Sequence, residues 1–444
     1  MSDPIWGLLG SDAIPSQRRT RTLDIGSSIR FYNNLAVPGL GGIWFGKQLF
    51  LAMLGVSVAQ EARERHGKSF NNIRTANAIE ALACLLTLES TEWKSDPRLR
   101  GSTKMKSRHT GDYNFATISR PDFYVTQPMR MSTVQPLFAL GLVREDSGSR
   151  FNSFKCSDEG NQFVYEFSRE YGQCYYTSDL RDCLIKWVVE KSFYPKRSTV
   201  QEGLSPLEPL RQGASSYLRL LLERGGRCED REDVTRRKNA LAWMELLRAK
   251  SEQVISWDNK PPVISDDHWQ DLRTGSLLFA ARDMAIETLD IVEDHIFSLQ
   301  KRRMELKQDV PFAIRESLQH LKETSQAFLD QAPKDEAGAT FCREMAQGST
   351  LQRLTNLVRR DELVLKFRGG AILPGPAFKK DDRQTGDEPI QDQPSDRSEE
   401  GNKIHWPDNI SYRVRNLFLL NADLHGEIGD WLGDMESQTG DFNV

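Results

Sequence analysis

The stretch GGIWFGKQ, residues Gly41 to Gln48, has glycine and lysine spacing close to that of a phosphate-binding loop. In such loops backbone amides cradle the phosphates, the lysine reaches them, and a Ser or Thr hydroxyl after the lysine binds Mg²⁺. Gln48 stands at the hydroxyl position, and the bulky side chains between the glycines would crowd an anion. We therefore interpret the stretch as a helix entry with Trp44 and Phe45 packed inside. A nucleotide-dependent enzyme that uses Lys47 is kept as the third alternative.

The other residue types that could do chemistry are scattered. Six cysteines include no C-x-x-C pair, which argues against a zinc site and a disulfide-rich scaffold. Acids stand next to histidine at Asp266–His268 and Glu293–His295, but adjacent helical residues point to different sides. We expect both triplets to lie on a solvated helix face. The sequence predicts no catalytic residue, no cofactor and no metal.

Positive charge is concentrated between residues 94 and 155. This region has 11 Lys or Arg and five Asp or Glu, an excess of 11 − 5 = +6 in a chain of net charge −4. Its core, RLRGSTKMKSRHTG, has no acid and several turn-forming residues, so we expect an exposed basic loop. Cations on such a loop bind phosphates and release counterions. The candidate DNA-binding residues of the loop are Arg98, Arg100, Lys104, Lys106 and Arg108. The alternative is an ordinary solvated loop.

The residues that follow the basic loop predict a helix, a turn, a hairpin and a second helix. Ser132 and Gln135 have the spacing of a capping box, and Gly141 ends the helix. LVRED and SRFNSFKC are two short strands about a Ser-Gly turn. Ser157 is the expected cap of the next helix.

This order resembles the winged-helix family, particularly repressors of the multiple-antibiotic-resistance type, whose recognition helix ends in a GLV turn before a charged wing. The pattern covers about 45 residues, and residues 73–172 if Ile73 to Ser90 is the first helix. The resemblance implies a helix that enters the major groove of double-stranded DNA. It assigns base-edge or phosphate contacts to Arg130, Ser132, Thr133 and Gln135, and a basic wing to Arg144, Arg150 and Lys155. Winged helices also serve as protein-docking modules, so the partner stays open.

Helical periodicity dominates the rest of the chain and predicts a mainly α-helical multidomain protein with an embedded winged-helix module. The longest predicted helix runs from Asp266 to about Arg302, and Pro311 to Gln331 is expected to pair with it. We expect five segments, which are a helical segment at 1–72, a winged-helix domain at 73–175, a helical scaffold at 176–376, a disordered acidic linker at 377–403 and a docking helix at 404–444.

These features together predict a non-catalytic DNA-binding and assembly subunit of a bacterial complex, for DNA transactions or phage defence. The layout is loosely similar to that of kleisin subunits of bacterial condensins. The first alternative is a helical adaptor that binds proteins only, through residues 404–444. No signal peptide is evident and the longest apolar stretch, Leu49 to Ala59, is too short to span a bilayer, so we expect a cytoplasmic protein.

Overall fold

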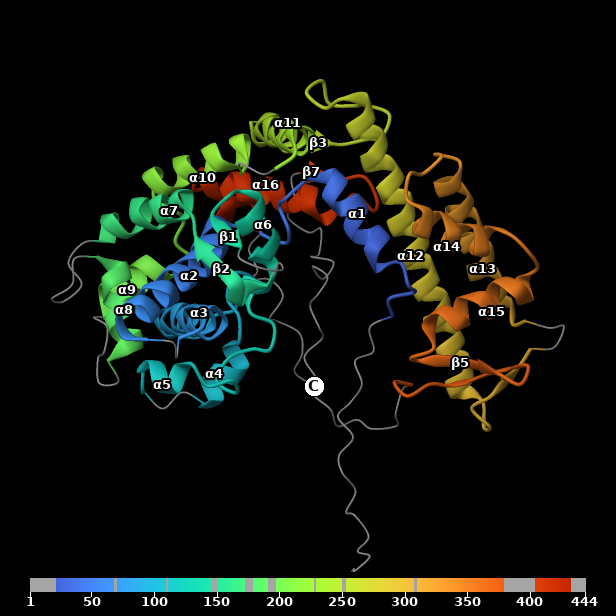
Figure 1. Ribbon diagram of the computed structural model, residues 1–444. Coiled ribbons are helices and arrows are strands. Elements are labelled where there is room, and N and C mark those ends of the chain that lie inside the picture. The colour runs from blue at the N-terminus through green and yellow to red at the C-terminus, as the bar shows by residue number, and fades with distance from the viewer. Residues whose placement is uncertain are drawn as a thin grey trace, which may run out of the picture. The chain divides into compact units, whose positions relative to one another are not determined.

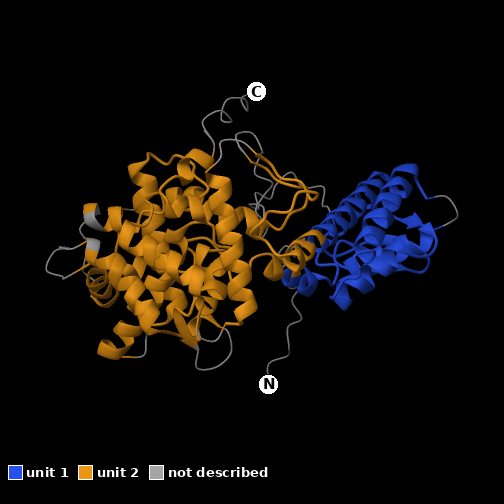
Figure 2. Cartoon of the chain, turned by 90° about the horizontal axis from the view of Figure 1, so that it is seen from above, with its two compact units in different colours: residues 1–31, 274–391 blue, residues 32–273, 392–444 orange. Residues whose placement is uncertain are grey.

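The computed structural model is mainly α-helical, as predicted, with sixteen α-helices among the residues that it describes. These residues are 21–67, 70–108, 111–145, 150–171, 179–190, 197–226, 229–249, 253–306, 310–378 and 404–432. The chain forms two compact units (Figure 2). Unit 1 comprises Met1–Phe31 and Thr274–Gln391, and unit 2 comprises Tyr32–Arg273 and Asp392–Val444. The helices α1 (Gly26–Ala36) and α12 (Asp266–Ser298) each contribute to both units.

Helix α2 (Gly46–His66) is the core of unit 2, and each of its residues from Gly46 to Ala59 is buried. It packs on α3 (Asn72–Ser90), which starts where the Asn71 side chain accepts a hydrogen bond from the Arg74 amide. A Cβ atom on Gly55 would lie 2.4 Å from the Ala76 Cβ, so glycine is what lets the two helices approach closely.

A ring of short elements surrounds this helix pair (Figure 1). In chain order they are α4 (Ser102–Arg108), α5 (Phe115–Ile118), η1 (Met129–Thr133), α6 (Val134–Ala139), β1 (Val143–Glu145), η2 (Phe151–Ser153), β2 (Phe154–Cys156), α7 (Asp158–Ser168) and η3 (Arg169–Tyr171). The longer helices that follow are α8 (Leu180–Val189), α9 (Arg197–Leu204), α10 (Gln212–Arg224) and α11 (Arg231–Arg248).

The predicted hairpin is present, since β1 and β2 pair antiparallel with Val143 opposite Cys156. Ser157 caps α7 as expected by accepting from the Gly160 amide, whereas the predicted Ser-Gly turn lies outside the described residues. The predicted capping box of Ser132 and Gln135 is wrong. α6 starts at Val134, two residues after Ser132, and has no side-chain cap. Ser132 lies instead in the 3₁₀ turn η1.

The C-terminal segment belongs to unit 2 itself. β7 (Ile404–His405) pairs in parallel with β3 (Gln253–Val254), and α16 (Tyr412–Leu424) packs on α10, α11 and α2 before η4 (Ile428–Trp431) (Figure 1). Most of α16 is buried, including its apolar residues Val414, Leu417, Phe418 and Leu420. The predicted docking helix of 404–444 therefore docks on its own unit, and its residues beyond 432 lie outside the described part.

Unit 1 is built on the long helix α12, which ends at Ser298 and so is four residues shorter than predicted. It continues through β4 (Met304–Glu305), α13 (Phe312–Leu329), α14 (Glu336–Ala346) and α15 (Thr350–Asp361). The predicted packing of the 311–331 helix on the long helix is present, because the Thr288 and Ser317 hydroxyls lie 2.6 Å apart. Arg21 ties the N-terminal segment to this unit through ion pairs with Glu293 (3.0 Å), Asp361 (3.5 Å) and Asp290.

A small antiparallel sheet of order β4-β6-β5 completes unit 1. β5 (Leu365–Arg368) and β6 (Ala371–Pro374) are joined by Gly369 and Gly370, whose φ angles of 57° and 74° are the left-handed values of a tight hairpin. Ala377 and Phe378, expected to begin the linker, are buried in this unit instead, and residues 379–403 lie outside the described part.

The boundaries of the two units do not coincide with those of the five predicted segments. Unit 1 interrupts unit 2 between Arg273 and the return of the chain at β7, so the predicted scaffold of 176–376 is divided between them. Trp269, just before the interruption, and Trp406, just after it, both pack against Trp243. Among the described residues, no helix combines the length and the apolar character that crossing a membrane requires.

Candidate nucleic-acid interface

The N-terminus of α2, where GGIWFGKQ lies, is closed to ligands. The Gly46 amide donates to Asp423 Oδ2 at 2.8 Å, and Lys47 Nζ donates to the Gly203 carbonyl at 2.9 Å. The Lys47 side chain is 0% exposed and lies 4.6 Å from the centre of the Phe167 ring. The amide and the ammonium that a phosphate would need are therefore both engaged, in support of the helix-entry interpretation.

Burial also sets the electrostatics of this helix start. It lowers the pKa of Lys47 to about 7, against an opposing effect of the Asp423 charge, and it raises the pKa of Asp423 to about 6. A charged group in an apolar interior is costly, so each shift favours the neutral form. The Lys47 amino group therefore bonds another part of the protein and is not available to a ligand.

A different set of cations converges on the surface segment Ser119–Tyr124. Arg74 of α3 donates to the Ser119 hydroxyl at 3.0 Å through Nη2. Lys104 of α4 donates to the Tyr124 carbonyl at 2.7 Å, and Arg108 pairs with Asp122 at 3.1 Å. Three cations from two helices thus contact a turn of six consecutive residues.

Two further arginines complete this group, which we call the basic cluster. Arg120 is exposed within the segment itself. Arg130 donates to Asn77, one turn after Arg74 on α3, and its guanidinium lies 5.2 Å from the centre of the Phe151 ring. The basic cluster is therefore Arg74, Lys104, Arg108, Arg120 and Arg130.

A buried carboxylate, that of Glu80, positions the cluster. It accepts from the amides of Met129 (2.6 Å) and Arg130 (3.1 Å) and from the Tyr124 hydroxyl (2.8 Å). Burial raises the pKa of Glu80, whereas its hydrogen bonds and the charge of Arg130 lower it. By bonding both chain segments, Glu80 fixes the end of Ser119–Tyr124 against the start of η1.

Few carboxylates oppose the basic cluster. Asp122 pairs with Arg108, but the two side chains are 73% and 43% exposed, and such surface pairs contribute about 0–1 kcal/mol and exchange readily with other ions. Asp112 is the second nearby carboxylate; hydrogen bonding by Thr117 lowers its pKa, and the charge of Arg120 contributes. Five cations thus face two surface carboxylates and the buried Glu80, which acts on Arg130.

The predicted wing residues are exposed and lie beside the cluster or on the hairpin. Arg150 directly precedes Phe151, the ring on which Arg130 lies. Arg144 and Lys155 are opposite each other in the hairpin register, and Arg144 pairs with Asp158 at 2.9 Å. All three side chains can be reached from solvent.

Four other predicted residues bond other parts of the protein, through the side chain or, for Ser132, through the backbone. The Arg98 side chain is 12% exposed and bonds Asp96 and the Leu207 carbonyl. Thr133 is buried, and the Ser132 carbonyl accepts from the Gly42 amide at 3.2 Å. Gln135 donates to Asn34 and accepts from Arg413. The residues of η1 and α6 that were expected to read base edges are therefore bonded in part to other elements of unit 2.

The last two predicted residues lie around α4. Lys106 is exposed, with its ammonium 6.0 Å from the centre of the Trp93 ring, whereas the Arg100 backbone amide bonds the buried Cys84 sulfur.

Neither Arg74 nor Arg120 was among the DNA-binding residues predicted from the sequence. Arg74 lies outside the region whose charges were counted, yet it is the only charged residue in the first two turns of α3. A lone cation at the start of an otherwise uncharged stretch was the available signal.

No group of three or more His, Cys, Asp or Glu that could hold a metal occurs in the described part of the chain. The solvated helix face predicted for the acid–histidine triplets is wrong in part. His268 is buried, with Nε2 2.9 Å from the Ala36 carbonyl oxygen, and Glu293 is buried beside Arg21.

Comparison with known proteins places the chain in no family, because no family model, curated protein or solved structure matches it.

Proposed function

We propose that this chain is a non-catalytic assembly subunit that contacts the sugar–phosphate backbone of double-stranded DNA through the basic cluster of unit 2. One observation carries the proposal: Arg74, Lys104 and Arg108 contact Ser119–Tyr124, which itself contains Arg120, and Arg130 lies nearby on Asn77 of α3, in a chain of net charge −4. Phosphates that replace the counterions of such a surface gain affinity through counterion release.

The proposed contact is with backbone and not with bases. Base reading needs polar side chains that project into a groove, but Thr133 is buried and bonds the Arg130 carbonyl, and the Gln135 amide bonds Asn34 and Arg413. The exposed residues of η1 and α6 include Met131 and Phe138, which have no hydrogen bond to offer a base edge. DNA binding of this kind depends weakly on sequence and steeply on salt.

The wider setting is part of the same proposal. The helix, hairpin and helix of residues 129–168 follow the order that resembles winged-helix proteins, and a bacterial cytoplasmic complex for DNA transactions or phage defence suits such a subunit. Arg150 and the hairpin cations would extend the contact beyond the basic cluster.

The test is binding of the full chain to a fluorescein-labelled duplex of about 30 base pairs, measured by fluorescence polarisation over a salt series. Replacing Lys104, Arg108 and Arg120 by Gln keeps much of each stem and should weaken binding at least about tenfold. It should also reduce the slope of log affinity against log salt by about 2–3. The matched control replaces three exposed cations of unit 1, Lys301, Arg303 and Arg315, by Gln. Equal affinity of the two triple variants would remove the proposal.

A second candidate is a helical adaptor that binds protein only. Met131 and Phe138 are 49% and 47% exposed on η1 and α6, an apolar pair where a DNA-reading helix would be polar. In that case the unmodified chain binds no duplex, and Met131→Ser with Phe138→Ser releases a co-purifying protein. Deleting residues 404–444 would not separate the two candidates, because it also removes α16, which packs on α2, α10 and α11 in unit 2.

A further inference from the structure

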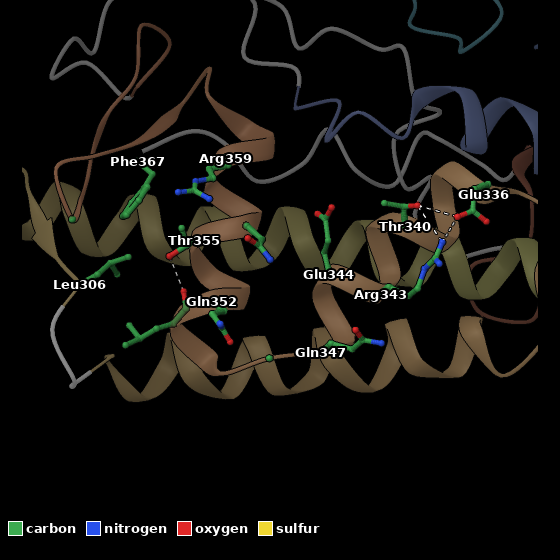
Figure 3. Close-up of a pocket in the computed structure, with 14 residues that line it drawn as sticks. Leu306, Glu336, Thr340, Arg343, Glu344, Gln347, Gln352, Thr355, Arg359 and Phe367 are labelled. Carbon is green, nitrogen blue, oxygen red and sulfur yellow. Dashed lines mark hydrogen bonds and ion pairs between the residues drawn. The ribbon is translucent and has the colours of Figure 1, made fainter.

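Unit 1 contains an open groove of about 950 Å³ along α14 and α15. Its lining residues fall within 306–370 of the sequence, and none of them belongs to the basic cluster. One end is bounded by Phe367 of β5 and by Leu306 after β4 (Figure 3). The other end is bounded by Glu336 and Thr340 at the start of α14. The groove lies wholly within unit 1 and was not anticipated from the sequence.

One wall of the groove is a row of hydrogen-bond donors on α15. Gln352, Asn356 and Arg359 follow one another at spacings of four and three residues, which puts them on one face of the helix. The Gln352 carbonyl already accepts from the Ser349 amide, so its NH₂ group is the part left for a ligand. The Asn356 amide has no hydrogen-bond partner among the described residues.

The charge of the groove is unequal along its length. Glu336 and Arg343 form an ion pair at one end, and Glu344 accepts from Arg360 at 2.7 Å. Arg359 lies at the opposite end, 5.2 Å from the centre of the Phe367 ring, with no carboxylate partner in the described part of the chain. Both acids of the groove are thus neutralised, and one guanidinium is left available.

We propose that this groove binds an extended acidic peptide segment of a partner protein. The peptide carbonyls would accept from Gln352 and Asn356, and an Asp or Glu side chain would pair with Arg359. From Gln352 to Arg359 the row rises about 10 Å at 1.5 Å per residue, which matches about three residues of extended chain at 3.3 Å each. Side-chain amides and a planar guanidinium suit these acceptors, and a charge-assisted pair is stronger than a neutral one.

The openness of the groove favours a peptide over a small metabolite. Sites for small molecules bury most of the ligand surface in a concave, mainly apolar pocket. This groove is lined largely by Gln, Asn, Thr, Arg and Glu on two helix faces and stays open to solvent (Figure 3). The inference goes beyond DNA contact and names the chemistry of a partner for the assembly role.

The test is selection of a phage-displayed library of random linear 12-residue peptides on the immobilised full chain. Asp- or Glu-containing peptides should be enriched. A fluorescein-labelled synthetic copy of the most enriched peptide should bind Arg359→Glu at least about tenfold more weakly, as expected for a lost charge-assisted contact. The matched control is Arg315→Glu, since Arg315 is also exposed and also lies over a ring, that of Phe312, at 5.8 Å, but outside the groove. That variant should bind within about twofold of the unmodified chain.

Three outcomes of the peptide experiments would overturn the proposal. They are no enrichment of acidic peptides, equal peptide binding by Arg359→Glu and the unmodified chain, or equal loss in the Arg315→Glu control. The labelled duplex used for the basic cluster provides a further arm. If Arg359→Glu weakens duplex binding as much as the triple variant of Lys104, Arg108 and Arg120, the groove belongs to a nucleic-acid surface and the peptide proposal is wrong. If the triple variant keeps its DNA affinity while peptide binding depends on Arg359, only the proposed DNA function is lost.

Discussion

The start of α2 and the basic cluster are both places where cations meet polar backbone, and they differ in what the cations can reach. Lys47 is buried, bonds the Gly203 carbonyl and shares its surroundings with Asp423. Arg108 bonds backbone and Asp122 too, but from the surface. The spacing of glycine and lysine at the first resembles a phosphate-binding loop, but only the second leaves its cations accessible to solvent. A glycine–lysine motif or an arginine run thus indicates chemistry only when the fold leaves its charge exposed.

The largest effect should come from deleting α16, the helix whose Asp423 bonds the start of α2. A chain ending at residue 403 lacks α16, whose four buried apolar residues contribute about 1.5–3 kcal/mol each, a sum comparable with the 5–15 kcal/mol stability of a typical domain. We expect unit 2 to lose its cooperative thermal transition in circular dichroism and its amide protection in α2. Duplex binding should be lost with it. A chain ending at Leu432 keeps every described residue and is the control; the same loss there would contradict the role assigned to α16.

The next effect concerns the carboxylate at the α2 start. Asp423→Ala leaves the Gly46 amide without its acceptor and the Lys47 ammonium without a nearby opposite charge. Leaving the buried Gly46 amide without an acceptor should lower the free energy of unfolding in urea by about 1–3 kcal/mol. Asp408→Ala, at an exposed position of the same C-terminal segment, should change it by under about 0.5 kcal/mol. Similar values for the two variants would mean that the α2 start does not depend on Asp423.

The pH dependence of stability should follow from the same two groups. The pKa of Asp423 is about 6 in the folded chain and ordinarily 3.8, so the folded state holds this proton more tightly. Its contribution to stability is present below about pH 4 and is lost as the pH rises through 6. The pKa of Lys47 is about 7 and ordinarily 10.5, so its contribution is present above pH 10.5 and is lost as the pH falls through 7.

Urea unfolding at pH 4.5, 6.5 and 9 would check both branches. Relative to the unmodified chain, Asp423→Asn should remove the gain at low pH, up to about 3 kcal/mol at 1.36 kcal/mol per pKa unit. Lys47→Met should remove the gain at high pH. Parallel stability profiles for all three proteins would show that neither group titrates differently on unfolding.

The smallest effect is expected at Asp122, the exposed carboxylate beside Arg108 of the basic cluster. Asp122→Ala frees Arg108 at the surface, so thermal stability should change by less than about 1 kcal/mol. Duplex affinity should rise about two- to fivefold at low salt, because a competing carboxylate is removed from the basic cluster. Asp158→Ala, which frees Arg144 on the hairpin, tests whether the wing shares the contact. Weaker duplex binding by Asp122→Ala would show that this carboxylate supports the surface.

The features that sequence predicts well here are local. Ser157 caps its helix as predicted because a cap depends on residues within one turn. The β5–β6 hairpin follows from two adjacent glycines, and the length of α12 from its apolar periodicity. The fold class follows from the same signals.

The features that sequence could not predict depend on distant partners. Met129 and Arg130 form η1 because Glu80, about fifty residues earlier, accepts from both amides. Gln135 leaves the expected capping box for Asn34 and Arg413. Arg74 joins Lys104 and Arg108 only through the path of Ser119–Tyr124, which no periodicity indicates. Proximity of this kind becomes visible only in three dimensions.

The amide of Gly46 finds its acceptor 377 residues later, and this separation has a consequence for biosynthesis. At about 5–20 residues per second, a ribosome needs roughly 20–75 s to deliver Asp423 after Gly46. Through that interval α3, α7 and α8 can already pack on α2, but the Gly46 amide lacks its acceptor and the surfaces of α10 and α11 that α16 covers stay exposed. A nascent chain of this design would benefit from holdase chaperones until its last helix leaves the exit tunnel.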